Sequence, residues 1–292
     1  MNLTTIFYHV DEFCKLFEKE FSLRTLSNGK NIRKRKCSLK LSEVMTIAIY
    51  YHQSGYKTFK DYYTRSAELL LAFPKLTSYN RFVELQQKIG MPLAIFTKLH
   101  NVGACTGTSF IDSFSLSVSH QRRIRSHKTF KGLAARGKTS VGWFYGFKVH
   151  IIINELGQIL NFMITPGNIV DNNATIIEKM TENIYGKIYG DKGYLLNEKM
   201  FKKLYSRGVH IVTKIRKNMK NIPMDIGDKI MLRKRGVIES VGAILKEDLN
   251  IEHSRYRSPV SLFVNVLSSL AAYSFREKKP SIYRKGFILL TA

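Results

Sequence analysis

The sequence predicts an α/β protein in which a mixed β-sheet is flanked by helices and preceded by an all-helical N-terminal segment. Apolar residues recur at helical spacing through roughly the first hundred residues. Alternating and β-rich runs then begin near residue 109. Beyond residue 174, helical patterns alternate with further strand-like runs, an order that favours a sheet covered by helices.

The N-terminal segment is expected to fold as several helices. Phe7, Val10 and Phe13 start an apolar pattern of helical spacing. Ser42 is expected to cap a later helix, because a serine hydroxyl accepts hydrogen bonds from the backbone of a first helical turn. We predict a helical N-terminal domain over residues 1–104, with helices over residues 44–52, 58–72 and 78–89.

The remaining residues, 105–292, are expected to form a second domain that contains the sheet. Residues 109–118 alternate between apolar and polar, which places Asp112 on the same face as Phe110 and Phe114. Three antiparallel strands followed by strands linked through helices is the ribonuclease-H-like topology, but a fold alone does not establish a function. The expected strands cover residues 109–118, 143–154, 158–165, 187–190 and 209–215, and the expected helices cover residues 174–185, 198–206, 234–249 and 261–275.

The chain carries a large excess of positive charge. There are 47 Lys and Arg residues against 22 Asp and Glu, which gives a formal net charge of +25 and an isoelectric point near 9.9. Such an excess attracts polyanions and speeds their capture. Nucleic acid is the leading candidate partner, since phosphate contacts supply most non-specific affinity for DNA. The alternative is a generally basic protein without an anionic partner.

Cysteine content and hydropathy argue against several other classes. The three cysteines show no CxxC spacing, so neither a zinc site nor a disulfide framework is expected. The N-terminus lacks the basic start and the apolar run of a signal peptide. Residues 260–272 form the longest apolar stretch near the end, which is shorter than the ~18 residues that a membrane span needs. We therefore expect a soluble protein of the reducing cytoplasm with no membrane partner.

Three acidic residues are candidate catalytic groups and metal ligands: Asp112, Asp191 and Glu239. Asp112 interrupts an apolar strand face, where a charge is costly unless it is paired or bound to a metal ion. Asp191 follows a short strand and lies between Gly190 and Gly193. Glycines at these positions permit close approach of a ligand such as a phosphate.

Glu239 is expected on a helix that presents it between two cations. The spacing of Arg235, Glu239 and Lys246 puts them along one stripe, which also includes Gly242. The acid would hold metal, and the cations would meet phosphates. Phosphoryl transfer suits two divalent ions, and magnesium prefers oxygen ligands. A neighbouring stripe of the same helix is apolar and consists of Val237, Val241, Leu245 and Leu249.

Each acid also has a purely structural interpretation. Asp112 would be exposed if the strand register were shifted. Asp191 would belong to an ordinary Asp-Lys-Gly turn. Glu239 would form ion pairs along an exposed helix. Only the order and spacing of the three acids together favour an active site.

Taken in order, these residues resemble a known family. An Asp in a first strand, an Asp in GDKGY and a Glu in a helix are similar to insertion-sequence transposases of the DDE type. The helix resembles their Y-x2-R-x3-E-x6-K pattern at Arg235, Glu239 and Lys246, although Leu232 stands in place of the Tyr. The stretches GKTSVGWFYGFKVH and ITPGNIVDNN resemble insertion-sequence family 982. The resemblance covers roughly residues 110–249, and more loosely the helical start.

The resemblance implies a transposase that cleaves element ends and joins the freed 3′-hydroxyl to target DNA. It implies two Mg²⁺ ions, for which Mn²⁺ would substitute, held by Asp112, Asp191 and Glu239. Double-stranded DNA would be the partner, the N-terminal domain would bind it, and a homodimer would handle two ends in the bacterial cytoplasm at the nucleoid. Asp171 is a lesser candidate acid. The alternatives are a nuclease of the same fold without strand transfer and a non-catalytic protein that binds DNA ends.

Basic residues near the acids are expected to contact the DNA backbone, which positions DNA without specifying its sequence. Residues 120–131 and 214–235 supply most of them, and residues 31–36 are a further basic stretch. The alternative for residues 120–131 is a solvated loop, and the alternative for residues 31–36 is a charged linker. The expected DNA contacts are Arg122, Arg123, Arg125, Lys128, Lys131, Lys148, Lys192, Lys214, Arg216, Lys217, Arg235 and Lys246.

An aromatic cluster begins the second long strand. Trp143, Phe144, Tyr145 and Phe147 are expected to be strand core rather than a platform for stacking bases. His150 lies on the alternate face together with Lys148, from which it would approach DNA.

Overall fold

The computed structural model describes residues 2–24, 37–100, 103–140, 142–214, 223–252 and 256–283. The chain divides into two compact units, neither of which is continuous in sequence. The first comprises Met1–His100, Leu245–Ile251 and Tyr256–Glu277, and the second comprises Asn101–Ile244, Glu252–Arg255 and Lys278–Ala292. In the described ranges, no helix combines the length and apolar character needed to cross a membrane.

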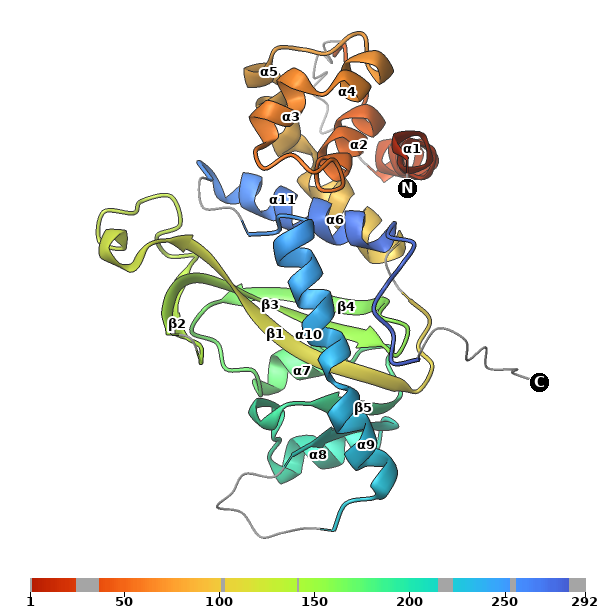
Figure 1. Cartoon of the computed structure of the whole chain (residues 1–292), viewed down its shortest axis with the longest axis vertical. Helices are drawn as coiled ribbons and strands as arrows, with labels where there is room; N and C mark the ends of the chain where they lie inside the picture. Colours follow the sequence, from red (N-terminus) through yellow and green to blue (C-terminus); the bar gives the residue numbers. More distant parts are fainter. Residues whose placement is uncertain are drawn as a thin grey trace, which may run out of the picture. The chain divides into compact units, whose positions relative to one another are not determined.

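The first unit is helical, as the sequence predicts. Side-chain caps start several of its helices, because Thr58, Ser66 and Ser78 each accept a hydrogen bond from a backbone N–H of the first turn. Its helices are α1 (Leu3–Arg24), α2 (Leu41–Tyr51), α3 (Phe59–Arg65), α4 (Ala67–Ala72), α5 (Tyr79–Gln86), α6 (Gly90–His100) and α11 (Pro259–Ser274), with a short 3₁₀ turn at Gln87–Ile89 (Figure 1).

Two local expectations for this unit are wrong. Ser42 does not cap α2, because the helix already begins at Leu41 and Ser42 is buried inside it. The cap position belongs to Lys40, whose backbone N–H donates to the Glu43 carboxylate at 2.6 Å. The expected single helix over residues 58–72 is two helices, since Ser66 has an extended backbone and caps α4.

Helix α11 packs with the N-terminal helices, although it lies near the C-terminus. It contacts α6 and α2, and Gln53 Nε2 donates to the Ala272 carbonyl at 2.9 Å. Ala271, Ala272 and Tyr273 are fully buried. The expected domains were divided in chain order at residue 104, whereas these contacts group a distant segment with the first unit.

The second unit contains a mixed sheet of six strands. The strand order is β2-β3-β1-β5-β6, and β4 also pairs with β3. β1 pairs antiparallel with β3 and parallel with β5, which in turn is parallel to β6. The strands are β1 (Thr108–Ser119), β2 (Ala135–Lys138), β3 (Trp143–Asn154), β4 (Ile159–Pro166), β5 (Gly186–Gly190) and β6 (Val209–Thr213).

Both faces of this sheet are covered by helices, which confirms the expected mixed α/β architecture. One face packs Ile111, Ile152 and Ile188 into a core that also contains residues of α7 (Ala174–Met180) and α8 (Glu198–Tyr205). On the other face α10 (Gly236–Ala243) contacts β1, and α9 (Ile226–Lys234) contacts β5 and β6. Figure 1 shows α10 running across β1.

Strand β2 was not expected, and the helix over residues 234–249 is not continuous. β2 has the sequence ARGK, which lacks the alternation that marks a half-buried strand. The helix is interrupted at Arg235, between α9 and α10, and closes in a π-helical turn at Ile244–Asp248. Its predicted apolar stripe is nevertheless buried throughout, at Val237, Val241, Leu245 and Leu249.

Where β1 pairs with β3, Gly146 leaves no room for a side chain. A Cβ there would lie 1.9 Å from the Leu116 carbonyl oxygen, next to the register irregularity between Ser117 and Ser119. Gly146→Ala is therefore expected to lower the free energy of unfolding by about 1–3 kcal/mol, the usual cost of overpacking. Gly236→Ala is the matched control, because its added Cβ would meet nothing within 4 Å. Equal unfolding midpoints for the two variants in urea would contradict this account of the close approach between β1 and β3.

Candidate active site

Asp112 lies in the middle of β1, on the face covered by α9 and α10. It pairs with Ile151 of β3 and shares its face with Phe110, which is fully buried, so the expected register is the one observed. The Ser113 backbone N–H donates to Asp112 Oδ1 at 2.8 Å. The carboxylate is 27% exposed and therefore only partly hydrated.

Asp191 follows β5, the parallel neighbour of β1. Phe110 is paired with Tyr189, so Asp112 and Asp191 stand at equivalent positions, each two residues further along its strand. Gly193 N–H donates to Asp191 Oδ1 at 2.7 Å and fixes the turn. A Cβ on Gly193 would lie 2.9 Å from the same oxygen, which is why a glycine suits this position.

Glu239 reaches the same region from α10, and Arg235 links it to the sheet. Arg235 Nη2 lies 2.9 Å from Glu239 Oε1 and 3.6 Å from Asp112 Oδ2. The arginine is 15% exposed, whereas Glu239 is 63% exposed. The intrahelical ion pair of the structural interpretation of Glu239 is therefore present, and Arg235 extends it to Asp112 on the strand.

The three acids and Arg235 interact electrostatically. Burial, together with the charges of Asp191 and Glu239, raises the pKa of Asp112 to about 6, against the opposing effects of Arg235 and of the Ser113 backbone hydrogen bond. Burial alone would lower the pKa of Arg235, but the hydrogen bond to Glu239 and the charges of Asp112 and Asp191 raise it. One guanidinium thus stands within the field of three carboxylates that would otherwise repel one another.

The donor set is chemically suited to a hard divalent cation. All three side chains offer carboxylate oxygens, and their mutual repulsion favours a bound positive charge. Within the described ranges, however, no three or more His, Cys, Asp or Glu residues already form a ready-made metal cluster. The acids surround Arg235, whose buried Nη1 has no hydrogen-bond partner among the described residues. Arg235 therefore contributes a mostly buried positive charge to this site.

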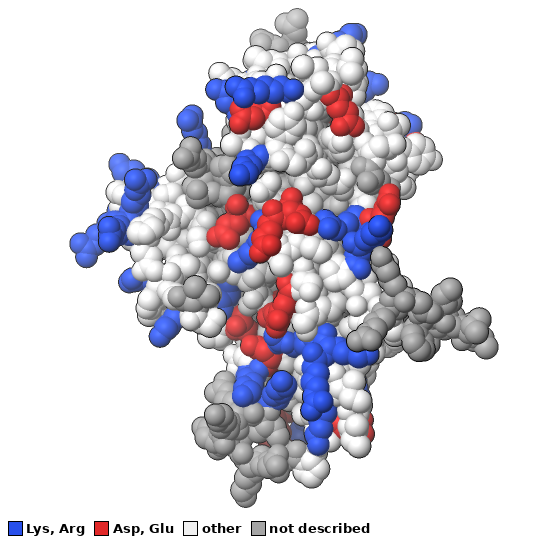
Figure 2. All heavy atoms as spheres, viewed as in Figure 1, with Lys and Arg blue, Asp and Glu red and all other residues white. Residues whose placement is uncertain are grey.

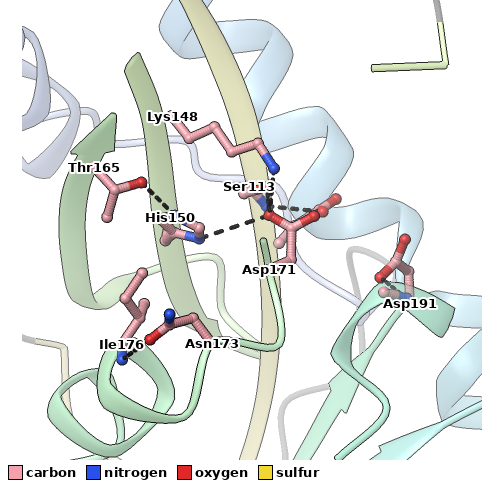
Figure 3. A network of polar contacts seen from close by, with 10 residues as sticks. Ser113, Lys148, His150, Thr165, Asp171, Asn173, Ile176 and Asp191 are labelled. Atoms are coloured by element: carbon pink, nitrogen blue, oxygen red, sulfur yellow. Dashed lines mark hydrogen bonds and ion pairs between the residues drawn. The ribbon is translucent and has the colours of Figure 1, made fainter. Parts of the chain in front are cut away.

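A second polar network lies on the opposite face of β1 (Figure 3). Asp171 Oδ1 accepts hydrogen bonds from Ser113 Oγ at 2.7 Å and from Lys148 Nζ at 3.0 Å. Figure 3 shows Lys148, His150 and Ser113 directed toward Asp171. Asp171 is thus tied, through Ser113, to the backbone group that holds Asp112.

His150 is part of this network and does not reach solvent. It is fully buried, and its Nε2 lies 3.0 Å from Thr165 Oγ1. Burial lowers its pKa to about 4, so the ring is neutral at physiological pH. The expectation that His150 approaches DNA is therefore wrong, because the sheet and its neighbours cover it.

Tyr194 is a residue of the site that the sequence analysis did not single out. Its side chain is buried, and burial together with the charges of Asp171 and Asp112 raises the pKa of its hydroxyl well above the usual value. Its position in the GDKGY stretch, three residues after Asp191, was the available signal.

Most of the expected DNA contacts are exposed, but not all lie where they were expected. Lys148 is only 13% exposed and is paired with Asp171. Lys246 lies in the π-helical turn and is partly buried. Arg216 and Lys217 fall outside the described residues, as do residues 31–36. The exposed members are Arg122, Arg123, Arg125, Lys128, Lys131, Lys192 and Lys214.

The part of the chain that holds these acids matches a known protein family. The sequence model of the transposase DDE domain matches residues 102–259, more than half of the chain. The chain belongs to the DDE transposase family. All three candidate acids fall inside the matched residues, so the part of the expectation that concerns the family is confirmed.

Two solved structures are similar to this DDE family member over most of its length. One is the Mos1 transposase paired-end complex with left transposon end, at 11% identity and a TM-score of 0.28, covering 89% of this chain and 82% of that chain. The other is the Mos1 Strand Transfer Complex, at 11% identity and a TM-score of 0.22, covering 90% of this chain and 84% of that chain. Likeness at such scores carries no argument about this chain. No curated protein matches it.

The raised pKa of Asp112 gives the stability of the protein a defined pH dependence. Ionising this carboxyl costs more in the folded state, so the contribution of Asp112 to stability is fully present below its ordinary pKa of 3.8 and is lost as pH rises through about 6. The loss amounts to at most ~3 kcal/mol, since one pKa unit corresponds to about 1.4 kcal/mol. Asp112→Asn removes this contribution, so its stability relative to the wild type should improve steadily between pH 4 and neutrality.

Urea unfolding at a series of pH values, with a chelator present, measures this difference. Glu198→Gln serves as the matched control, because Glu198 is an acid of α8 whose side chain is 79% exposed. Parallel pH profiles for the wild type and Asp112→Asn would show that Asp112 is an ordinary, hydrated carboxylate.

Proposed function

We propose that this protein is a transposase that cleaves the ends of an insertion sequence and transfers the freed 3′-hydroxyl strand to target DNA. The observation that carries the proposal is the convergence of Asp112, Asp191 and Glu239 on Arg235, within the residues that match the DDE family. Three acids from two parallel strands and a crossing helix form one acidic site in a protein of formal net charge +25.

The strand order supports a ribonuclease-H-like catalytic core. Three antiparallel strands, β1, β3 and β4, lead into β5 and β6, which continue the sheet in parallel on the other side of β1. The first acid lies on the central strand and the second follows its parallel neighbour. In open sheets, ligands gather at the carboxyl ends of such strands.

Asp112, Asp191 and Glu239 would hold two Mg²⁺ ions, and Mn²⁺ would substitute. Such ions, when bound, supply the positive charge that stabilises the attacking and leaving oxygens of an in-line displacement. The residues of the chain do the rest. Arg235, whose Nη2 lies beside Glu239 and Asp112, would add a fixed positive charge next to the scissile phosphate. Asp171 holds Ser113 and thereby fixes the orientation of Asp112.

Double-stranded DNA is the proposed substrate, and the exposed basic residues would hold its backbone. None of Arg122, Arg123, Arg125, Lys128 and Lys131 forms an ion pair with a carboxylate among the described residues. Their charges are therefore available to phosphates. We further propose that the helices within residues 1–104 bind element ends, that a homodimer handles two ends, and that the protein belongs to insertion-sequence family 982 and acts in the bacterial cytoplasm at the nucleoid.

The decisive test substitutes the two acids that are exposed enough to be changed without disturbing the core. Asp191→Asn and Glu239→Gln should each lower cleavage and joining by at least about a hundredfold, the scale expected when a group acting on the transition state is removed. Binding of element ends should remain, because neither acid contacts the DNA backbone. Glu198→Gln is the matched control, since Glu198 is an exposed helical acid that pairs with Lys202.

The assay uses pre-cut and uncut element ends with Mg²⁺ or Mn²⁺ and a supercoiled target. Cleavage without any joined product would identify a nuclease of the same fold. End binding without cleavage in the wild type would identify a non-catalytic protein. Full activity in Asp191→Asn would remove that acid from the site.

A further inference from the structure

The turn between β2 and β3 presents a tryptophan to solvent. Trp143 is the only tryptophan in the chain, and it is 52% exposed. Its neighbours Phe144, Tyr145 and Phe147 are buried, as expected, whereas the expectation that Trp143 belongs to the strand core is wrong. It begins β3 at the outer end of the hairpin, beyond the edge of the core.

Two cations lie over the Trp143 ring. Arg136 Cζ is 5.1 Å and Lys138 Nζ is 5.6 Å from the ring centroid. Lys138 is paired with Trp143 across the two strands, so both side chains emerge on the same face. Each contact is a cation–π interaction of the kind found at exposed sites.

Gln121 fixes this arrangement from the loop that follows β1. Its Nε2 donates to the Trp143 carbonyl, and its Oε1 accepts from Arg136 Nη2 at 3.1 Å. The hairpin is closed by reciprocal backbone hydrogen bonds between Thr139 and Gly142, at 2.8 and 3.2 Å. The backbone that carries the Trp143 ring is therefore fixed before any ligand arrives, which lowers the entropy cost of binding.

The surroundings of the ring are strongly cationic. Residues 120–143, here called the Trp143 arm, contain no Asp or Glu. Among the described residues, neither Arg136 nor Lys138 forms an ion pair with a carboxylate, so their charges are not neutralised there. Figure 2 shows Lys and Arg gathered on the projecting loop after β1, with no acidic residue among them on this face. The arm carries five further cations, Arg122, Arg123, Arg125, Lys128 and Lys131.

We propose that Trp143 stacks on an unpaired base of DNA while Arg136 and Lys138 move from the ring to the flanking phosphates. The proposal rests on the proposed function, which makes DNA the substrate. In a duplex each base is covered by its neighbours, so only an unstacked base presents a free face to the indole. Cleavage at an element end produces a strand terminus where such a base is available.

The exchange of partners is favourable on general grounds. A cation–π contact at an exposed site raises an equilibrium constant by only about 2- to 5-fold, whereas stacking of a base on an aromatic side chain raises affinity by roughly 5- to 100-fold. The displaced cations are not lost, since they bind phosphates of the same strand. The aromatic ring can stack on the base of a nucleotide, and the cations beside it can bind the phosphates.

Intrinsic fluorescence tests the proposal directly, because all tryptophan emission of the protein comes from Trp143. The wild type is titrated with single-stranded oligothymidylate, with an abasic strand of the same length, and with a blunt duplex. Oligothymidylate should quench the emission strongly, and the abasic strand and the duplex should bind without comparable quenching. Equal quenching by the abasic strand would overturn the proposal, since the ring would then respond to phosphates alone.

Variants separate stacking from a structural role. Trp143→Ala should weaken binding of oligothymidylate by about 5- to 100-fold, Trp143→Phe should recover part of the loss, and affinity for the abasic strand should stay within about twofold in both. Thermal unfolding followed by circular dichroism reports the fold of each variant. Equal losses for the normal and abasic strands would overturn the proposal.

Different experimental outcomes would overturn the stacking proposal and the transposase proposal. Asp191→Asn should show the same quenching as the wild type, because Asp191 lies outside the Trp143 arm. Active cleavage and joining without base-dependent quenching would overturn the stacking proposal alone. Quenching in a protein that neither cuts nor joins DNA would leave stacking standing and overturn the transposase proposal.

Discussion

The parallel pairing of β1 with β5 is the constraint on which the candidate site depends. It sets Asp112 and Asp191 at matching positions on adjacent strands, since Phe110 stands opposite Tyr189. Helix α10 crosses β1 on the same face and brings Glu239 to them. A shift of the β1–β5 register by one residue would turn one of the two aspartates to the other face of the sheet and separate the pair.

Bringing three carboxylates together is electrostatically costly, and the fold offsets this cost locally. Arg235 contacts Asp112 and Glu239 and lies within the field of Asp191, while the backbone of Ser113 and Gly193 donates to the two aspartates. Burial still raises the pKa of Asp112 to about 6. Such stored repulsion is typical of sites that bind a cation or a transition state with a different charge distribution.

The sequence predicted the features that follow from periodicity and order, and it missed those that depend on tertiary contacts. Alternation around Asp112 predicted its register, and the spacing from Arg235 to Glu239 predicted their contact. Trp143 was expected to be buried because aromatic residues favour strand cores, but its place at the end of a short polar hairpin leaves it exposed. The tie from Asp171 to Ser113 joins residues far apart in the chain, so no local pattern reveals it.

The central claim is that Asp112, Asp191 and Glu239 surround one cation-binding site. Iron-directed hydroxyl-radical cleavage of the protein chain tests it most directly, with Fe²⁺ in place of Mg²⁺ and with ascorbate and peroxide present. The account predicts backbone cuts at three separate segments, around residues 112, 191 and 239, and their suppression by excess Mg²⁺. Cuts at only one of these segments, or cuts that Mg²⁺ leaves unchanged, would contradict it.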